Sequence, residues 1–264
     1  MPYLSKIRIN PLRRKGRDLL SNPHIAHAMI SGGIAEQPVT QRILWRIDAP
    51  NPRQPDLLVL TSSKPDWSHI VEQAGWPYAE GEHFLIRDYE PLLRHIAVGR
   101  EYAFKLTANP VQNTINPLKP SGQQREQRAK GQTRAFRVPH TTSAHQTEWL
   151  LGKLPNLGFT IPQLTFGPPV PGGETDDSGD TRNPTPTAPI VRDVLVTAGE
   201  RLNFAKNSTR TGPRVSLVTA TYEGRLRVTD ADVLRERLLG GVGPAKAYGC
   251  GLLTLAPLAA DRHA

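Results

Sequence analysis

YLSKIRI, residues 3–9, alternates in a two-residue period that is typical of a β-strand. Downstream, Asn22 and Pro23 indicate the start of a helix, because asparagine caps free helical amides and proline suits the first helical position. We expect this helix to cover residues 23–30, since two glycines follow it and end helices readily. The segment therefore predicts a strand followed by a helix.

The next segments extend this order to a complete motif. Residues 43–48 (ILWRID) and 57–61 (LLVLT) predict two strands, and residues 66–74 predict a helix. Residues 101–107 again alternate and predict the closing strand. The resulting order, β-α-β-β-α-β, is the ferredoxin-like topology, so we expect a first domain over residues 1–118.

The second half of the chain repeats this plan approximately. Residues 109–143 are polar and basic, which predicts a linker, or an arm that orders on a partner; we place the linker at 119–145. A second ferredoxin-like domain is expected over 146–264. Its predicted elements are a helix at 146–154, strands at 158–166, 190–197, 201–205, 215–222 and 225–229, a helix capped by Asp230, and a strand at 252–255.

The charge balance indicates a polyanionic partner. Lys and Arg number 33 against 24 Asp and Glu, a formal charge of +9, and neutralising phosphates drives association with nucleic acids. A basic protein without a nucleic-acid role remains the alternative. Cys250 is the only cysteine, which excludes a disulfide framework or a thiolate zinc site within the chain. Without a signal peptide or a long apolar run, we expect a soluble cytoplasmic protein with no membrane partner.

A glycine-rich stretch, GVGPAKAYGCG at 241–251, is the strongest local motif. Its glycines allow backbone torsions closed to other residues and a close approach of a phosphate, with Lys246 as a point charge. The motif lacks the Gly-Lys-Ser/Thr ending of a P-loop, and it precedes a strand, unlike the dinucleotide fingerprint. A purely structural turn is the alternative. The glycines concerned are Gly241, Gly243, Gly249 and Gly251.

Four ordered motifs together resemble one known family. They are YLSKIRINPLRR at 3–14, LLSNPHIAH at 19–27, RILWRID at 42–48 and GVGPAKAYGCGLLTLAP at 241–257. They are similar to the CasE family, the Cascade endoribonucleases of type I-E CRISPR systems within the repeat-associated RNA-binding superfamily. The resemblance implies an α+β fold of two ferredoxin-like domains in tandem with antiparallel sheets.

The resemblance also implies an activity and its partners. A CasE-like chain would cleave precursor CRISPR RNA at the base of the repeat stem-loop, without a metal or other cofactor. Attack of a ribose 2′-OH would leave a 2′,3′-cyclic phosphate and a 5′-OH. The protein would then stay bound to the mature crRNA among the other Cascade subunits. The alternatives are a non-catalytic RNA-binding subunit of such a complex and a basic RNA-binding protein unrelated to CRISPR.

The family match assigns the catalytic role to His27, and His24 stands where some relatives carry a tyrosine. Independently, spacing i, i+3 places both imidazoles on one side of the first helical turns, where free amides attract a phosphate. Histidine exchanges protons near neutrality, so His27 suits a general base or acid, and the sequence leaves that choice open. Two alternatives remain for these histidines. They could bind a metal, although the sequence nearby offers no acidic or thiol ligand, or they could have no functional role.

Two basic segments are the candidate RNA contacts, because A-form RNA is held mainly through phosphates and shape. The first precedes the predicted catalytic helix, and the second is the region where the resemblance implies contact with the repeat stem. Within the second, Lys206 is the candidate for the scissile phosphate. A solvated charged loop is the alternative for each residue. The segments contain Arg13, Arg14, Lys15 and Arg17, and Arg201, Lys206, Arg210 and Arg214.

Overall fold

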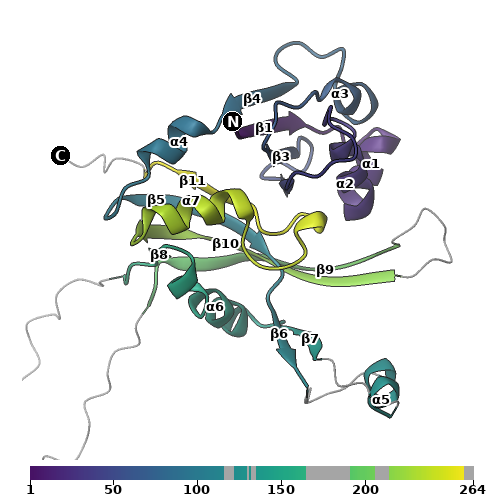
Figure 1. The fold of residues 1–264 in the computed structure, drawn as a ribbon. Coiled ribbons are helices and arrows are strands. Elements are labelled where there is room, and N and C mark those ends of the chain that lie inside the picture. The colour runs from purple at the N-terminus through teal and green to yellow at the C-terminus, as the bar shows by residue number, and fades with distance from the viewer. Residues whose placement is uncertain (116–121, 130, 132–134, 165–190, 206–213, 259–264) are drawn as a thin grey trace, which may run out of the picture.

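The computed structural model describes residues 1–115, 122–129, 131, 135–164, 191–205 and 214–258 of the chain. They form two antiparallel sheets, each with helices, and a small hairpin that projects from the second sheet (Figure 1). The two ferredoxin-like domains in tandem that the sequence predicted are confirmed. Within the described part of the chain, no helix combines the length and the apolar character that crossing a membrane requires.

The first sheet has the strand order β2-β3-β1-β4, as expected for a ferredoxin-like domain. Helices α1, α2 and α3 accompany it, and Ile7, Leu19, Ile30 and Ile70 belong to its core. The predicted alternation of the first strand is confirmed, because Ile7 is fully buried while its neighbours Lys6 and Arg8 are exposed. The elements are β1 (Tyr3–Arg8), α1 (Arg14–Ser21), α2 (Pro23–Ser31), β2 (Leu44–Asp48), β3 (Asp56–Thr61), α3 (Ser68–Ala74), β4 (Phe84–Asp88) and α4 (Glu90–His95).

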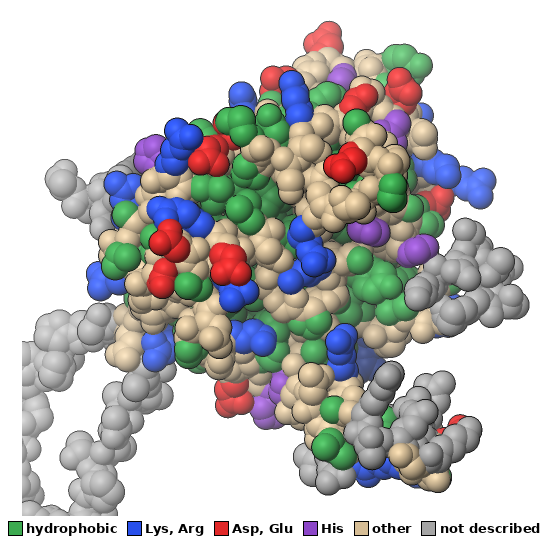
Figure 2. All heavy atoms as spheres, viewed as in Figure 1, with side chains coloured by type: hydrophobic (Ala, Val, Ile, Leu, Met, Phe, Trp, Pro, Cys, Tyr) green, Lys and Arg blue, Asp and Glu red, His purple; other side chains and the backbone are tan. Residues whose placement is uncertain are grey.

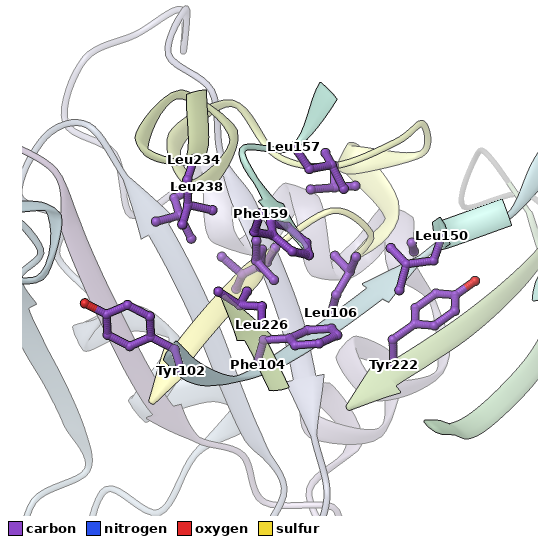
Figure 3. Packing of buried hydrophobic residues seen from close by; sticks show 14 of the residues in the cluster. Tyr102, Phe104, Leu106, Leu150, Leu157, Phe159, Tyr222, Leu226, Leu234 and Leu238 are labelled. Carbon is purple, nitrogen blue, oxygen red and sulfur yellow. The ribbon is translucent and has the colours of Figure 1, made fainter. Parts of the chain in front are cut away.

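The second sheet has the order β11-β5-β10-β8, and β9 also pairs with β10. Figure 3 shows Phe104 and Leu226 of this sheet packed with Leu234 and Leu238 of α7, and Leu150 of α6 joins the same core. The elements are β5 (Glu101–Ala108), β6 (Val111–Thr114), α5 (Gly122–Ala129), β7 (Phe136–Pro139), α6 (Ser143–Leu151), η1 (Leu154–Asn156), β8 (Phe159–Thr160), β9 (Val194–Ala205), β10 (Arg214–Val228), α7 (Ala231–Gly240), η2 (Lys246–Tyr248) and β11 (Leu253–Ala256).

The assignment of the strand at 101–107 to the first domain is wrong. That strand forms as β5, but it pairs with β10 and β11 in the second sheet. The fourth strand of the first sheet is instead β4, whose residues are half-buried or exposed and so lack a clear alternation. A division at residue 118 would separate β5 from its sheet. We therefore propose that the boundary lies in the segment between α4 and β5.

Two pairs of predicted strands are each one continuous strand. Residues 190–197 and 201–205 contribute to the single strand β9, and residues 215–222 and 225–229 contribute to β10. Gly224, between the predicted strands 215–222 and 225–229, lies inside β10, where a Cβ atom would come within 2.1 Å of the Asp193 carbonyl oxygen. The glycine thus serves a close backbone approach instead of a turn. The sequence of residues 168–189 is rich in Pro, Gly and Asp and predicts a loop, and this segment lies outside the described residues.

Candidate active site

Helix α2 begins as the sequence predicts. Asn22 is its N-cap, and the side-chain Oδ1 accepts a hydrogen bond from the His24 amide at 3.0 Å, with Pro23 in the first turn. The Asn22 amide also donates to the Asp18 carbonyl at the end of α1, so this residue forms the corner between the two helices. The cap therefore fixes where α2, which carries both candidate histidines, begins.

His27 is half-buried on α2, and its environment favours the neutral imidazole. Burial lowers the pKa of His27, and the nearby charge of His24 lowers this pKa further. The Nδ1 atom is buried and has no hydrogen-bond partner among the described residues. Burial shields Nδ1 from a substrate, so Nε2 is the candidate atom for proton exchange. The described residues contain no group of three or more His, Cys, Asp or Glu side chains arranged for a metal ion.

The glycine-rich motif lies beside this helix. Its short helix η2 packs against both α2 and β2, which brings residues from the end of the chain to the candidate histidines. Gly241, Gly243, Gly249 and Gly251 have φ values of 76°, 76°, 81° and 93°, so the predicted need for left-handed torsions is confirmed.

The close neighbours of these glycines are protein atoms. A Cβ atom on Gly241 would come within 2.6 Å of Leu44, and one on Gly249 would come within 3.0 Å of Trp45. Both contacted residues belong to β2 of the first domain, and both glycines are buried. Packing between the domains thus accounts for these two glycines without a phosphate, whereas contact of the motif with RNA stays a prediction.

Lys246 belongs to a cluster of positive charge beside α2. Its pKa is lowered by burial and by the charges of Arg42 and Arg237. Neither arginine was among the phosphate contacts predicted from the sequence, although Arg42 begins the family-like motif RILWRID. Figure 2 shows histidine side chains at the surface in the region of α2, and Lys and Arg side chains near the glycine-rich turn.

The first predicted basic segment lies on α1, which packs against α2. Arg13 and Arg17 donate hydrogen bonds to the backbone carbonyl oxygens of Gly75, at 3.4 Å, and Leu12, at 2.6 Å. Arg14, Lys15 and Arg17 are exposed, but Arg17 already donates to a backbone carbonyl oxygen. Within this segment, Arg14 and Lys15 are therefore the better candidates for contacting a phosphate.

The second basic segment lies on the β9–β10 hairpin, and β9 also contacts α2. Arg201 is exposed on β9, and Arg214 is exposed at the start of β10, where it donates to the Asn203 carbonyl oxygen at 3.2 Å. Lys206 and Arg210 lie outside the described residues. The described ends of the hairpin thus carry positive charge on β9, which contacts the histidine helix, and on its partner strand β10.

A cleft of about 630 Å³ lies between the two sheets, close to this region. Pro23 and Gly249 line part of it, but its charged lining includes the acids Asp48, Glu200 and Glu223 together with basic side chains. Because carboxylates repel phosphates, the cleft is a poor place for an RNA backbone. The surface around α2, the glycine-rich turn and the β9–β10 hairpin is the better candidate.

Comparison with known families agrees with these features. The model of the family described as CRISPR associated protein matches residues 2–257. The chain belongs to this family. Because that match includes α2, the glycine-rich turn and both sheets, the site described above consists of family elements throughout.

Individual relatives agree with the resemblance to the CasE family, which is confirmed. The chain is 28% identical to the CRISPR-associated endoribonuclease Cse3 of Thermus thermophilus, over 97% of this chain and 100% of that protein. It is 29% identical to the Cascade subunit CasE of Escherichia coli, over 74% and 77% of the two chains. A solved structure of Thermus thermophilus Cse3 bound to an RNA representing a pre-cleavage complex is 26% identical, with a TM-score of 0.66 over 97% and 99% of the chains.

Proposed function

We propose that this chain is an endoribonuclease that cleaves precursor CRISPR RNA at the base of the repeat stem-loop and remains bound to the mature crRNA in Cascade, in the cytoplasm. The carrying observation is the half-buried His27, with its lowered pKa, on a helix packed against the glycine-rich turn. The names of the relatives support this proposal, since one is an endoribonuclease and the other is a Cascade subunit.

His27 acts as the general base in this proposal. A lowered pKa keeps the imidazole neutral near pH 7, so Nε2 can accept the proton of the ribose 2′-OH. The 2′-oxygen then bonds to the adjacent phosphorus, and the bond from phosphorus to the 5′-oxygen breaks. The products are a 2′,3′-cyclic phosphate and a 5′-oxygen that takes up a proton. His24, one turn away, orients the 2′-OH or supplies that proton.

Positive side chains stabilise the extra charge that the phosphate gains during the reaction. Lys246 and Arg42 beside α2, with Arg201 and Arg214 on the neighbouring hairpin, are the described candidates. Lys206 remains the proposed contact to the scissile phosphate. No protein-bound metal is needed in this scheme, because imidazoles and fixed cations supply proton transfer and charge.

The test is cleavage of a labelled repeat hairpin in the presence of EDTA. We expect a single cut with cyclic-phosphate and 5′-OH ends, and loss of cleavage in His27→Ala with the affinity for the repeat hairpin unchanged. The control His83→Ala, directly before β4, should cleave normally. Binding without a cut by the wild-type protein would instead indicate a non-catalytic subunit. Equal affinity for the repeat hairpin and for unrelated RNA would refute a CRISPR role.

A further inference from the structure

Arg46 on β2 has only 3% of its surface exposed, yet every N–H of its guanidinium has an acceptor. Nε and Nη2 bind the two carboxylate oxygens of Asp48 at 2.8 and 2.9 Å. Nη1 donates to the carbonyl oxygens of Lys105 at 3.1 Å and Leu252 at 3.0 Å. Nη2 also donates to Thr254 Oγ1 at 3.0 Å. One side chain thus joins β2 of the first sheet to β5 and β11 of the second.

A second ionic link runs along the same seam. Lys105 Nζ lies 3.3 Å from Asp48 Oδ1 and 3.0 Å from Glu223 Oε1 on β10. The carboxylate of Asp48 therefore connects a buried guanidinium with an ammonium group of the other domain. Because burial of an unpaired charge is costly, this network favours one relative placement of the two sheets.

The seam is continuous with the candidate active site. Leu44 and Trp45 directly precede Arg46. Leu44 lies against Gly241 of the glycine-rich turn, and Trp45 lies against Gly249. Leu252, which accepts from Arg46, directly follows the last glycine of that turn. Since η2 within the turn packs against α2, a shift of β2 against β11 would move the turn relative to the helix that carries the histidines.

We propose that Arg46 is a positioning residue for RNA cleavage. It sets the register between α2 with His27, in the first domain, and the glycine-rich turn and β9–β10 hairpin, which carry the proposed phosphate contacts of the second domain. Arg46 itself contacts no RNA, because its donors are all used within the protein. This inference rests on the proposed function for its catalytic consequence only.

The expected effect separates cleavage from binding. In Arg46→Lys the charge remains, but an ammonium group lacks the planar fork that serves both domains at once. Misplacing a reactive group by about 1 Å costs about 100-fold in rate, so we expect single-turnover cleavage to fall about 10- to 100-fold. The affinity for the repeat RNA hairpin should stay within about twofold of the wild-type value, because most proposed RNA contacts belong to the second domain.

A distance measurement tests the register without cleavage. Tyr78, 99% exposed, and Leu195, 71% exposed, provide one cysteine substitution in each domain for spin labels, and Cys250 is too buried to react. We expect one narrow distance distribution in the wild-type background and a broadened or shifted one with Arg46→Lys. Arg227→Lys is the matched control, since the Arg227–Glu101 pair, at 3.0 Å, lies within the second sheet.

The outcomes are distinct. A folded Arg46→Lys protein with wild-type cleavage and an unchanged distance distribution would overturn the inference, as would affinity and cleavage rate falling in equal proportion. If Arg46→Lys does not fold, Thr254→Val, which removes one acceptor of the network, carries the same test with a smaller expected effect. If the wild-type protein does not cleave, the proposed function fails, while the distance distributions still decide whether Arg46 sets the register.

Discussion

Replacing Gly249 by alanine tests how closely the glycine-rich turn packs against Trp45 of the first domain, measured by the change in the free energy of unfolding. Gly249 has φ +81°, a conformation that costs an L-residue about 1–2 kcal/mol. Its new Cβ atom would also lie 3.0–3.3 Å from the six-membered ring of Trp45, which is 2% exposed and cannot easily move. Overpacking of this kind costs about 1–3 kcal/mol. Together these terms predict a destabilisation of about 2–5 kcal/mol.

Gly99→Ala is the matched control for this variant. Gly99 has φ +85°, but a Cβ atom added there would meet no other atom within 4 Å. The backbone cost and the stabilisation from a less flexible unfolded chain are therefore shared by both variants and cancel. The difference between them, about 1–3 kcal/mol, isolates the contact with Trp45.

Urea unfolding at equilibrium provides the measurement, with midpoints compared at unchanged slopes. Shortening the ring by Trp45→Phe should relieve part of the extra cost of Gly249→Ala, which a double-mutant cycle detects as coupling. Equal shifts of the unfolding midpoint for Gly249→Ala and Gly99→Ala would refute close packing of Gly249 against Trp45. A variant of full stability with weakened hairpin affinity would instead indicate that the glycine serves a phosphate.

Three further predictions concern protonation and helix capping. Burial and the charge of His24 lower the pKa of His27, so kcat/KM for cleavage should rise with pH through an apparent pKa below 6.5. In His24→Gln this apparent pKa should be higher. A rising limb with an apparent pKa above 6.5 in the wild type would contradict the prediction. Burial raises the pKa of Asp48, but its basic partners outweigh burial and lower it overall. Asp48→Asn should thus cost about 3 kcal/mol at pH 7 in urea unfolding, and the gap should close only as the pH falls below 3.8; a constant gap would contradict the pairing. Asn22→Ala should lower the free energy of unfolding by about 1 kcal/mol and slow cleavage. Asp230→Ala, at the cap of α7, should lower the free energy of unfolding by a similar amount but leave the cleavage rate unchanged.

Local features of the fold could be predicted from the sequence because their causes are local. The cap side chains of Asn22 and Asp230 accept hydrogen bonds from backbone amides two or three residues further along the chain. The alternation of buried and exposed residues in β1 follows from the pleat of the strand. The pairing of β5 could not be predicted in this way. Alternation tells which face of a strand is buried, but it does not tell which strand lies alongside.

The candidate site divides along the same line. The histidine pair and the glycine torsions follow from short motifs, whereas the burial of Arg46 depends on acceptors 59, 206 and 208 positions away. A strand pattern alone would place this charged side chain in solvent. The lowered pKa of His27 likewise reflects burial, and burial is set by the packed structure.

Packing explains why the glycine-rich motif is informative about the whole fold. Two of its glycines are seated on β2, its short helix contacts α2, and the residue after it accepts a hydrogen bond from Arg46. A change in the turn would therefore disturb the seam between the domains before it reached any RNA. Since the histidine helix belongs to one domain, and the glycine-rich turn and the β9–β10 hairpin belong to the other, the proposed site depends on the contact between the two domains.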